Sequence, residues 1–331
     1  MRRFAGLIIG MWCFVGCTVI DDDLSVCGVD YDLVYEMQLV TNVQMTVEEH
    51  LSAETEKAIA DSLKQWLAPI FSGQAHDLHM NFYATDDEGK LRQHCYEIID
   101  ASQKSYTLYI PREDYLHMAI VNTDDNPNMQ IEGEAYAPSL RVAQRAGDTL
   151  ASHQTAVYSA RLPMSISEHG NQSFYVNLYM LNCAVALVIE NTLTPMPSLR
   201  LFMEGGATCY DVKDSVFTYD HPSLIRAERV MDQCYALVTL PSKDAAPAGI
   251  TPVKRQPASA SLWQLKAYVT RADGTITETI LTVDTPLKAG TLEIIKVALN
   301  EDGSLAPVQT THVGASVTLD WKEGSSHEVE I

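Results

Sequence analysis

Positive charge is scarce in this sequence of 331 residues, which has 23 Lys and Arg against 43 Asp and Glu. The formal net charge of −20 repels nucleic-acid phosphates, so nucleic-acid binding is disfavoured. Long hydrophobic runs are also missing, because no stretch reaches the roughly 20 uncharged apolar residues that a membrane-spanning helix needs. With 46% hydrophobic and 20% charged residues the chain can bury real cores, and its length suits about two domains.

Motifs of enzymes and metal sites are missing as well. The sequence has no Gly-x-Ser-x-Gly, Ser-x-x-Lys or His-Glu-x-x-His pattern, no phosphate-binding glycine loop and no Cys-x-x-Cys pair. His76 and His79 precede a strand, where alternation sends their side chains to opposite faces. Asp124-Asp125-Asn126 runs into Pro127, which is typical of a polar turn and not of a calcium loop. We therefore predict no catalytic residues, no cofactor and no metal site.

The first 17 residues have the order of an export signal. Arg2 and Arg3 precede an uncharged apolar run over residues 4–15, and the run ends at Gly16-Cys17. This order resembles a bacterial lipoprotein signal peptide spanning residues 1–16, in which Cys17 becomes the lipidated first residue of the mature chain. An ordinary cleaved signal is the alternative. The acidic cluster over residues 21–23 is either a surface-export signal, as in some Bacteroidales lipoproteins, or a solvated tether.

Cysteines number seven, and Cys13 and Cys17 fall within or at the end of the signal. The others form an odd set in an exported chain, so at least one thiol stays unpaired. Cys209 and Cys234 are the candidate pair for a disulfide.

Alternation of apolar and polar residues predicts a mainly β chain. Residues 33–40 alternate, and so do residues 78–84, which an acidic turn at 86–89 joins to a second strand over 91–98 as a hairpin. The long apolar segment 174–189 predicts strands at the centre of a sheet. One face of a further strand is formed by Trp263, Leu265, Ala267 and Val269.

One helix interrupts this pattern. Thr46 and Glu49 form a capping box, and apolar residues recur at helical spacing as far as residue 70, where Pro69 and Gly73 stop the helix. A polar break at residues 165–172 is the preferred domain boundary, which predicts an N-terminal domain over 17–168 and a C-terminal domain over 169–331. Residues 244–261, rich in Ala, Pro and Ser, are predicted to form a long loop.

Several of these features together resemble the FimB-type fimbrial anchor family of Bacteroidales type V fimbriae, which is related to the fimbrillins. The most specific is the opening of the mature chain: Cys17, the aspartates at 21–23, Cys27 and then an alternating strand. The hairpin over 78–98, the apolar segment 174–189 and the closing strand over 313–321 fit the same pattern. The resemblance covers nearly all of the mature chain.

The resemblance implies two tandem transthyretin-like β-sandwich domains, with the helix inserted in the first. It also implies a non-catalytic subunit at the base of a filament, attached to the outer membrane through lipid and exposed at the cell surface. Fimbrillin-type stalk subunits are the implied partners, and a limit on filament length is the implied effect.

Two alternatives stay open. Stalk and tip subunits resemble the anchor, but stalk subunits lose their first strand to a protease that cuts after basic residues. The segment between Cys17 and Lys57 has no Lys or Arg, which favours the anchor. A surface glycan-binding lipoprotein is the other alternative, and it would need exposed aromatic platforms. The tryptophans on apolar faces are instead predicted to lie in cores: Trp66, Trp263 and Trp321.

Overall fold

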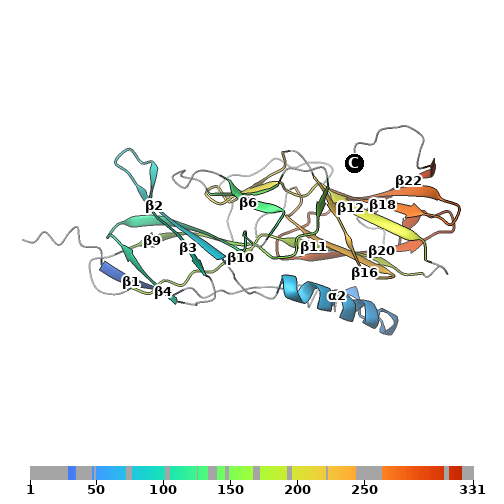
Figure 1. Cartoon of the computed structure of the whole chain (residues 1–331), viewed down its shortest axis with the longest axis horizontal. Helices are drawn as coiled ribbons and strands as arrows, with labels where there is room; N and C mark the ends of the chain where they lie inside the picture. The colour runs from blue at the N-terminus through green and yellow to red at the C-terminus, as the bar shows by residue number, and fades with distance from the viewer. Residues whose placement is uncertain are drawn as a thin grey trace, which may run out of the picture.

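The computed structural model describes residues 29–34, 47, 50–71, 77–100, 105–124, 126–132, 140–145, 149–166, 172–191, 196–220, 223–243, 263–308 and 313–322. The molecule is elongated, with strands along its whole length and a helix, α2, beneath the strands at one end (Figure 1). The fold class is the mainly β arrangement that the sequence predicts. The signal residues and Cys17 lie outside the described residues.

The predicted hairpin forms two adjacent strands of a five-stranded antiparallel sheet, which we call the first sheet. Gly89 takes a positive φ of 77° in the turn, and the Asp86 side chain accepts hydrogen bonds from the backbone N–H groups of Glu88 and Lys90. Glycine adopts this backbone without a steric penalty, which fixes the turn there. The strands are, in spatial order, β10 (Tyr179–Met180), β9 (Tyr158–Ser165), β5 (Asp114–Val121), β2 (Asp77–Thr85) and β3 (Leu91–Asp100).

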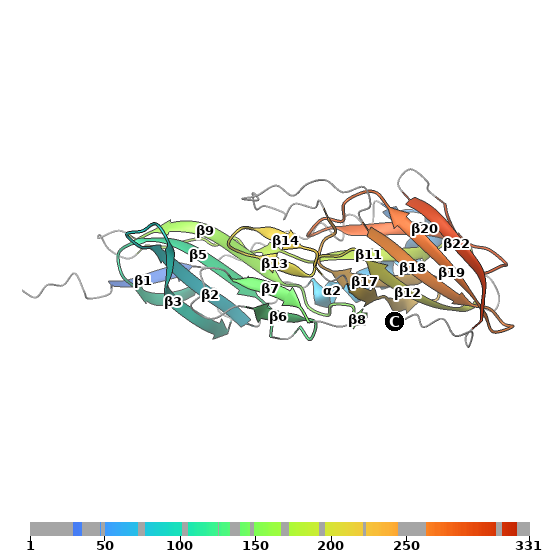
Figure 2. The same cartoon turned by 90° about the horizontal axis from the view of Figure 1, so that it is seen from above.

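Both faces of the first sheet are covered. On one face, Leu78 and Phe82 of β2 share a core with Leu108 of β4 (Ser105–Ile110), which pairs with β1 (Val29–Val34). On the other face, Tyr83 and Met118 pack with residues of the second sheet, which lies beside the first in Figure 2. The second sheet has the order β14 (Val216–Thr218), β13 (Cys209–Asp211), β7 (Arg141–Gln144) and β6 (Met129–Glu132).

The other end of the molecule is a sandwich of two further sheets around one core. The third sheet has the order β16 (Glu228–Met231), β17 (Cys234–Thr239), β11 (Cys183–Ile189), β20 (Leu292–Leu299) and β21 (Leu305–Pro307). The fourth sheet has the order β22 (Val313–Lys322), β19 (Thr275–Val283), β18 (Trp263–Thr270), β12 (Ser198–Glu204), β15 (Leu224–Arg226) and β8 (Thr149–Ala151). Strand β11 is buried along its whole length, as predicted for a central strand of the segment 174–189.

Helix α2 (Lys57–Ile70) follows a short 3-10 turn, η2 (Glu54–Glu56), and buries Ile59, Ala60, Leu63, Leu67 and Ile70. These residues form one stripe because they recur at helical spacing. The helix ends at Ile70, as predicted, but it begins at Lys57 and not at the predicted capping box of Thr46 and Glu49, since residues 51–53 are not helical. Pro69 has no backbone N–H to donate to the carbonyl of Gln65, so the helix is weakened at its C-terminal end.

The helix does not pack where the sequence suggested. Its residues precede the predicted boundary at 168/169, yet its buried stripe covers strands β16 and β17 of the third sheet, which follow that boundary (Figure 1). Two polar contacts link it there: the Trp66 Nε1–H donates to Glu228 Oε2 at 3.1 Å, and Glu56 forms an ion pair with Lys296 of β20. The helix therefore belongs to the predicted N-terminal domain by its place in the sequence, but it packs on strands of the predicted C-terminal domain.

Strands from both sides of residue 168 also share sheets. Strand β7 pairs with β13 in the second sheet, and β8 runs parallel to β15 in the fourth. The boundary itself stays a prediction, since residues 167–171 lie outside the described part, as does the whole of the predicted loop at 244–261. None of the helices among the described residues combines the length and the apolar character needed to cross a membrane.

Candidate functional site

The predicted disulfide is wrong in this structure, because Cys209 and Cys234 are both free thiols. They lie on different sheets: Cys209 is on β13 near Arg141, and Cys234 is on β17 within the core that α2 covers. Burial raises the pKa of the Cys234 thiol to about 12 and also raises the pKa of Cys209. The buried Cys183 is free as well, so these three cysteines behave as small core residues.

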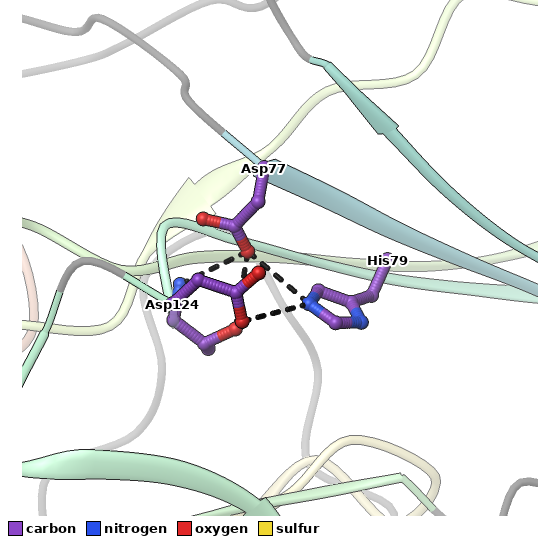
Figure 3. Close-up of polar contacts among 4 residues, drawn as sticks. Asp77, His79 and Asp124 are labelled. Carbon is purple, nitrogen blue, oxygen red and sulfur yellow. Dashed lines mark hydrogen bonds and ion pairs between the residues drawn. The ribbon is translucent and has the colours of Figure 1, made fainter.

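A polar cluster forms where the first sheet ends near the middle of the molecule. Asp77 and His79 are two residues apart at the start of β2, so their side chains share one face. Asp124 comes from the turn that follows β5, the neighbour of β2 in the sheet (Figure 3). His79 Nε2 lies 3.2 Å from Asp77 Oδ2 and 3.5 Å from Asp124 Oδ1.

The backbone of Asn122 directs the turn back over β2. Asn122 has a positive φ of 67°, a conformation that asparagine adopts more readily than most residues. Its backbone N–H donates to the carbonyl oxygen of Asp77 at 3.1 Å, and its side-chain amide donates to the carbonyl oxygen of Ala156 at 3.0 Å. This turn brings Thr123 and Asp124 onto Asp77, so the cluster is held by the fold.

Hydrogen bonds keep the Asp77 carboxylate charged. Burial alone would raise its pKa, but the hydrogen bonds from His79 and from Thr123 outweigh burial, and the pKa is lowered from its ordinary value. The backbone N–H and the hydroxyl of Thr123 both donate to Asp77 Oδ2 at 3.2 Å. The Asp77 side chain is only 10% exposed, whereas that of Asp124 is 64% exposed.

Sequence patterns alone do not reveal this cluster. They pair His79 with His76, which lies outside the described residues, and they indicate a polar turn for the aspartates after residue 123. The available signal was the Asp77-x-His79 spacing on a strand, since residues two apart share a face. Nothing in the sequence linked that face to Asp124.

A second candidate site is a groove of about 490 Å³ along β12, β15 and β16. Its charged lining is made by Arg200, Arg226 and Arg229. The Arg200 guanidinium lies 5.8 Å from the centre of the Tyr268 ring, and Arg229 pairs with Asp232. Guanidinium groups bind carboxylates and sulfates through paired hydrogen bonds, so this groove suits an anionic ligand.

No protein-family model matches the sequence, and no curated protein matches it either. Among solved structures, the chain is similar to a proposed polysaccharide-binding protein from Bacteroides thetaiotaomicron, with a TM-score of 0.52, 10% identity, and coverage of 86% of this chain and 99% of that one. A proposed adhesin from the same organism gives a TM-score of 0.50 at 9% identity, covering 90% of this chain and 100% of that one.

A third similar structure is the fimbrial anchor protein Mfa2 from Porphyromonas gingivalis, with a TM-score of 0.47, 10% identity, and coverage of 89% of this chain and 100% of that one. Identities this low show a shared fold and nothing about activity. The chain therefore shares its overall fold with these two Bacteroides thetaiotaomicron proteins along nearly its whole length.

Proposed function

We propose that this protein is a non-catalytic fimbrial subunit, held to the outer membrane by lipid on Cys17, and that it forms the base of a type V filament and limits its length. Support comes from the resemblance of the sequence to FimB-type anchors and from the β-sandwich fold. Surface exposure and contact with fimbrillin-type stalk subunits follow from this role.

The observation that carries the proposal is the first strand. Strand β1 pairs antiparallel with β4 without interruption, from Val29 opposite Ile110 to Val34 opposite Ser105. The strand begins earlier than the predicted residues 33–40, and residues 35–40 lie outside the described part. Because no Lys or Arg lies between Cys17 and Lys57, a protease that cuts after basic residues has no site at which to remove β1.

A retained first strand explains how growth of the filament would end at this subunit. Stalk subunits in the resembling family lose this strand and accept one from a neighbour. A strand already paired along its length leaves that edge of the sheet occupied, so no second subunit can add there. The lipid then holds the filament to the membrane.

The first experiment tests the anchor itself. Replacing Cys17→Ala should move the protein from the membrane fraction to the soluble fraction, because its attachment depends on acyl chains. Deleting the gene should give long filaments that are shed into the medium. If filament length and retention are unchanged in the deletion strain, this protein is not the anchor.

A second experiment supplies the missing protease site. Asp30→Arg places a basic residue within β1, and Asp30→Asn is the matched control that removes the same charge without creating a site. We expect cells with Asp30→Arg to shed fimbriae and to lose the lipid-bearing N-terminus from the protein, whereas Asp30→Asn cells retain both. Cleavage of Asp30→Arg without shedding would argue against the role of this strand.

The arginine groove favours one other function, the binding of an acidic glycan. Aromatic platforms give this alternative little support: Trp263 is 2% exposed, and Tyr175 is the exposed large aromatic side chain among the described residues. Binding of the purified protein to uronic-acid polymers, weakened tenfold or more in Arg226→Gln, would support it. A lack of such binding would leave the anchor as the sole proposal.

A further inference from the structure

We propose that Asp77, His79 and Asp124 form a binding site for a divalent transition-metal ion, with zinc as the best match. The three ligand atoms, one from each side chain, all lie within 4.8 Å of one another (Figure 3). This inference is independent of the fimbrial role proposed above.

The spacing of the ligand atoms fits a tetrahedral ion. Zinc binds histidine nitrogen and carboxylate oxygen at about 2.0–2.2 Å, so neighbouring ligand atoms around it are separated by about 3.3–3.6 Å. His79 Nε2 lies 3.2 Å from Asp77 Oδ2 and 3.5 Å from Asp124 Oδ1, which requires only small adjustments. Calcium fits poorly because it takes 6–8 oxygen ligands, and an imidazole cannot supply one.

The burial of Asp77 is a separate indication of a missing positive ligand. Its side chain is nine-tenths buried, its Oδ2 atom faces His79, and its Oδ1 atom, which points away from His79 and Asp124 in Figure 3, has no hydrogen-bond partner. A buried carboxylate oxygen without a partner is costly, and a second carboxylate, from Asp124, adds negative charge to the same place. A bound cation would compensate both carboxylates, and the net charge of −20 favours its approach.

The surroundings have the features of a site that is shaped before the ion arrives. Thr123 holds the Asp77 carboxylate with two hydrogen bonds, as outer partners commonly hold metal ligands. His79 is 5% exposed and is fixed on the sheet, whereas the exposed Asp124 leaves a side open to solvent. Three protein ligands and one open position, filled by water, complete a tetrahedral zinc site.

The rival interpretation is that His79 bridges the two carboxylates with no metal present. The two interpretations differ in what Asp124 does. In the metal site Asp124 is a ligand, so its loss weakens binding of the ion sharply. In the rival interpretation, Asp124 is a solvent-screened partner of His79, and its removal has little effect on the stability of the protein.

The experiment is a titration of the full mature chain with Zn²⁺ after removal of metals with a chelator. Calorimetry should show one equivalent bound with a micromolar or lower dissociation constant, and Co²⁺ should give the visible absorption of a tetrahedral ion. Asp124→Asn should weaken binding at least tenfold, and His79→Gln should do the same. The matched control is Asp87→Asn in the exposed turn between β2 and β3, which should bind like the wild type.

Asp124→Asn keeps the test valid even if His79→Gln destabilises the buried face, because Asp124 lies at the surface. As a second readout, excess Zn²⁺ should raise the melting temperature of the wild type and of Asp87→Asn but not of Asp124→Asn. Absence of saturable binding, or equal binding by the wild type and Asp124→Asn, overturns the proposal.

Discussion

We expect this protein to lose stability as the pH falls from 7 to 5, which is above the range in which carboxylates ordinarily titrate. The reason is that two histidines are buried in neutral form. Burial lowers the pKa of His117 and of His153 from 6.5 to about 4. His117 stacks on Phe82 with ring centres 4.5 Å apart, and its Nδ1 lies 3.1 Å from the carbonyl oxygen of Asn81. Neither imidazole is exposed to water.

The surroundings of His153 determine where its proton lies. The backbone N–H of Val157 donates to Asn182 Oδ1 at 2.6 Å, so the Asn182 amide turns its NH₂ group toward His153. That group lies 2.9 Å from His153 Nδ1, which must therefore accept, and the ring carries its proton on Nε2. A second proton on Nδ1 would face the NH₂ group of Asn182, which is also a donor. This clash adds to the free-energy cost of burying a charged imidazole.

The size and sign of the effect follow from linkage. Each folded pKa is depressed, so the stability is complete above pH 6.5 and falls as the pH drops from 6.5 toward 4, where the unfolded chain binds protons and the folded chain does not. Between pH 7 and pH 5 this amounts to about 2 kcal/mol for each histidine, or about 4 kcal/mol together.

Urea unfolding at fixed ionic strength, followed by tryptophan fluorescence between pH 7 and pH 5, measures this loss. His153→Gln and His117→Gln should each lower stability at pH 7 but remove about half of the pH dependence, and the two variants serve as controls for each other. A free energy of unfolding that stays constant over this range, or the same slope in both variants as in the wild type, would refute the reasoning.

Two further predictions concern the helix and the thiols. Leu63→Ala in α2 should lower the free energy of unfolding by about 3 kcal/mol, since Leu63 is fully buried against the third sheet. The control Gln65→Ala, on the exposed side of the helix, should change it little. Equal urea midpoints for the two variants would contradict this packing. Cys209 and Cys234 should resist alkylation in the native protein and react without reductant in denaturant, as peptide mapping can show; a peptide pair joined through these residues would contradict the free thiols.

Local patterns determined the elements of this protein. The alternation of Trp263, Leu265, Ala267 and Val269 predicts a strand with one buried face, and β18 has that burial pattern. The Asp86–Gly89 turn and the stripe of α2 were predictable for the same reason, since turn chemistry and residue period act over a few positions. The fold class could therefore be predicted from the sequence.

Associations between distant segments depended on the tertiary structure. Three features of the fold involve residues far apart in the chain. They are the parallel pairing of β8 with β15, the packing of α2 on the third sheet and the separation of Cys209 from Cys234. Asp77-x-His79 was visible as a shared face, but its contact with Asp124 required the register of β2 against β5 and the turn at Asn122. Register and packing are set by burial across the whole chain, which a local period does not contain.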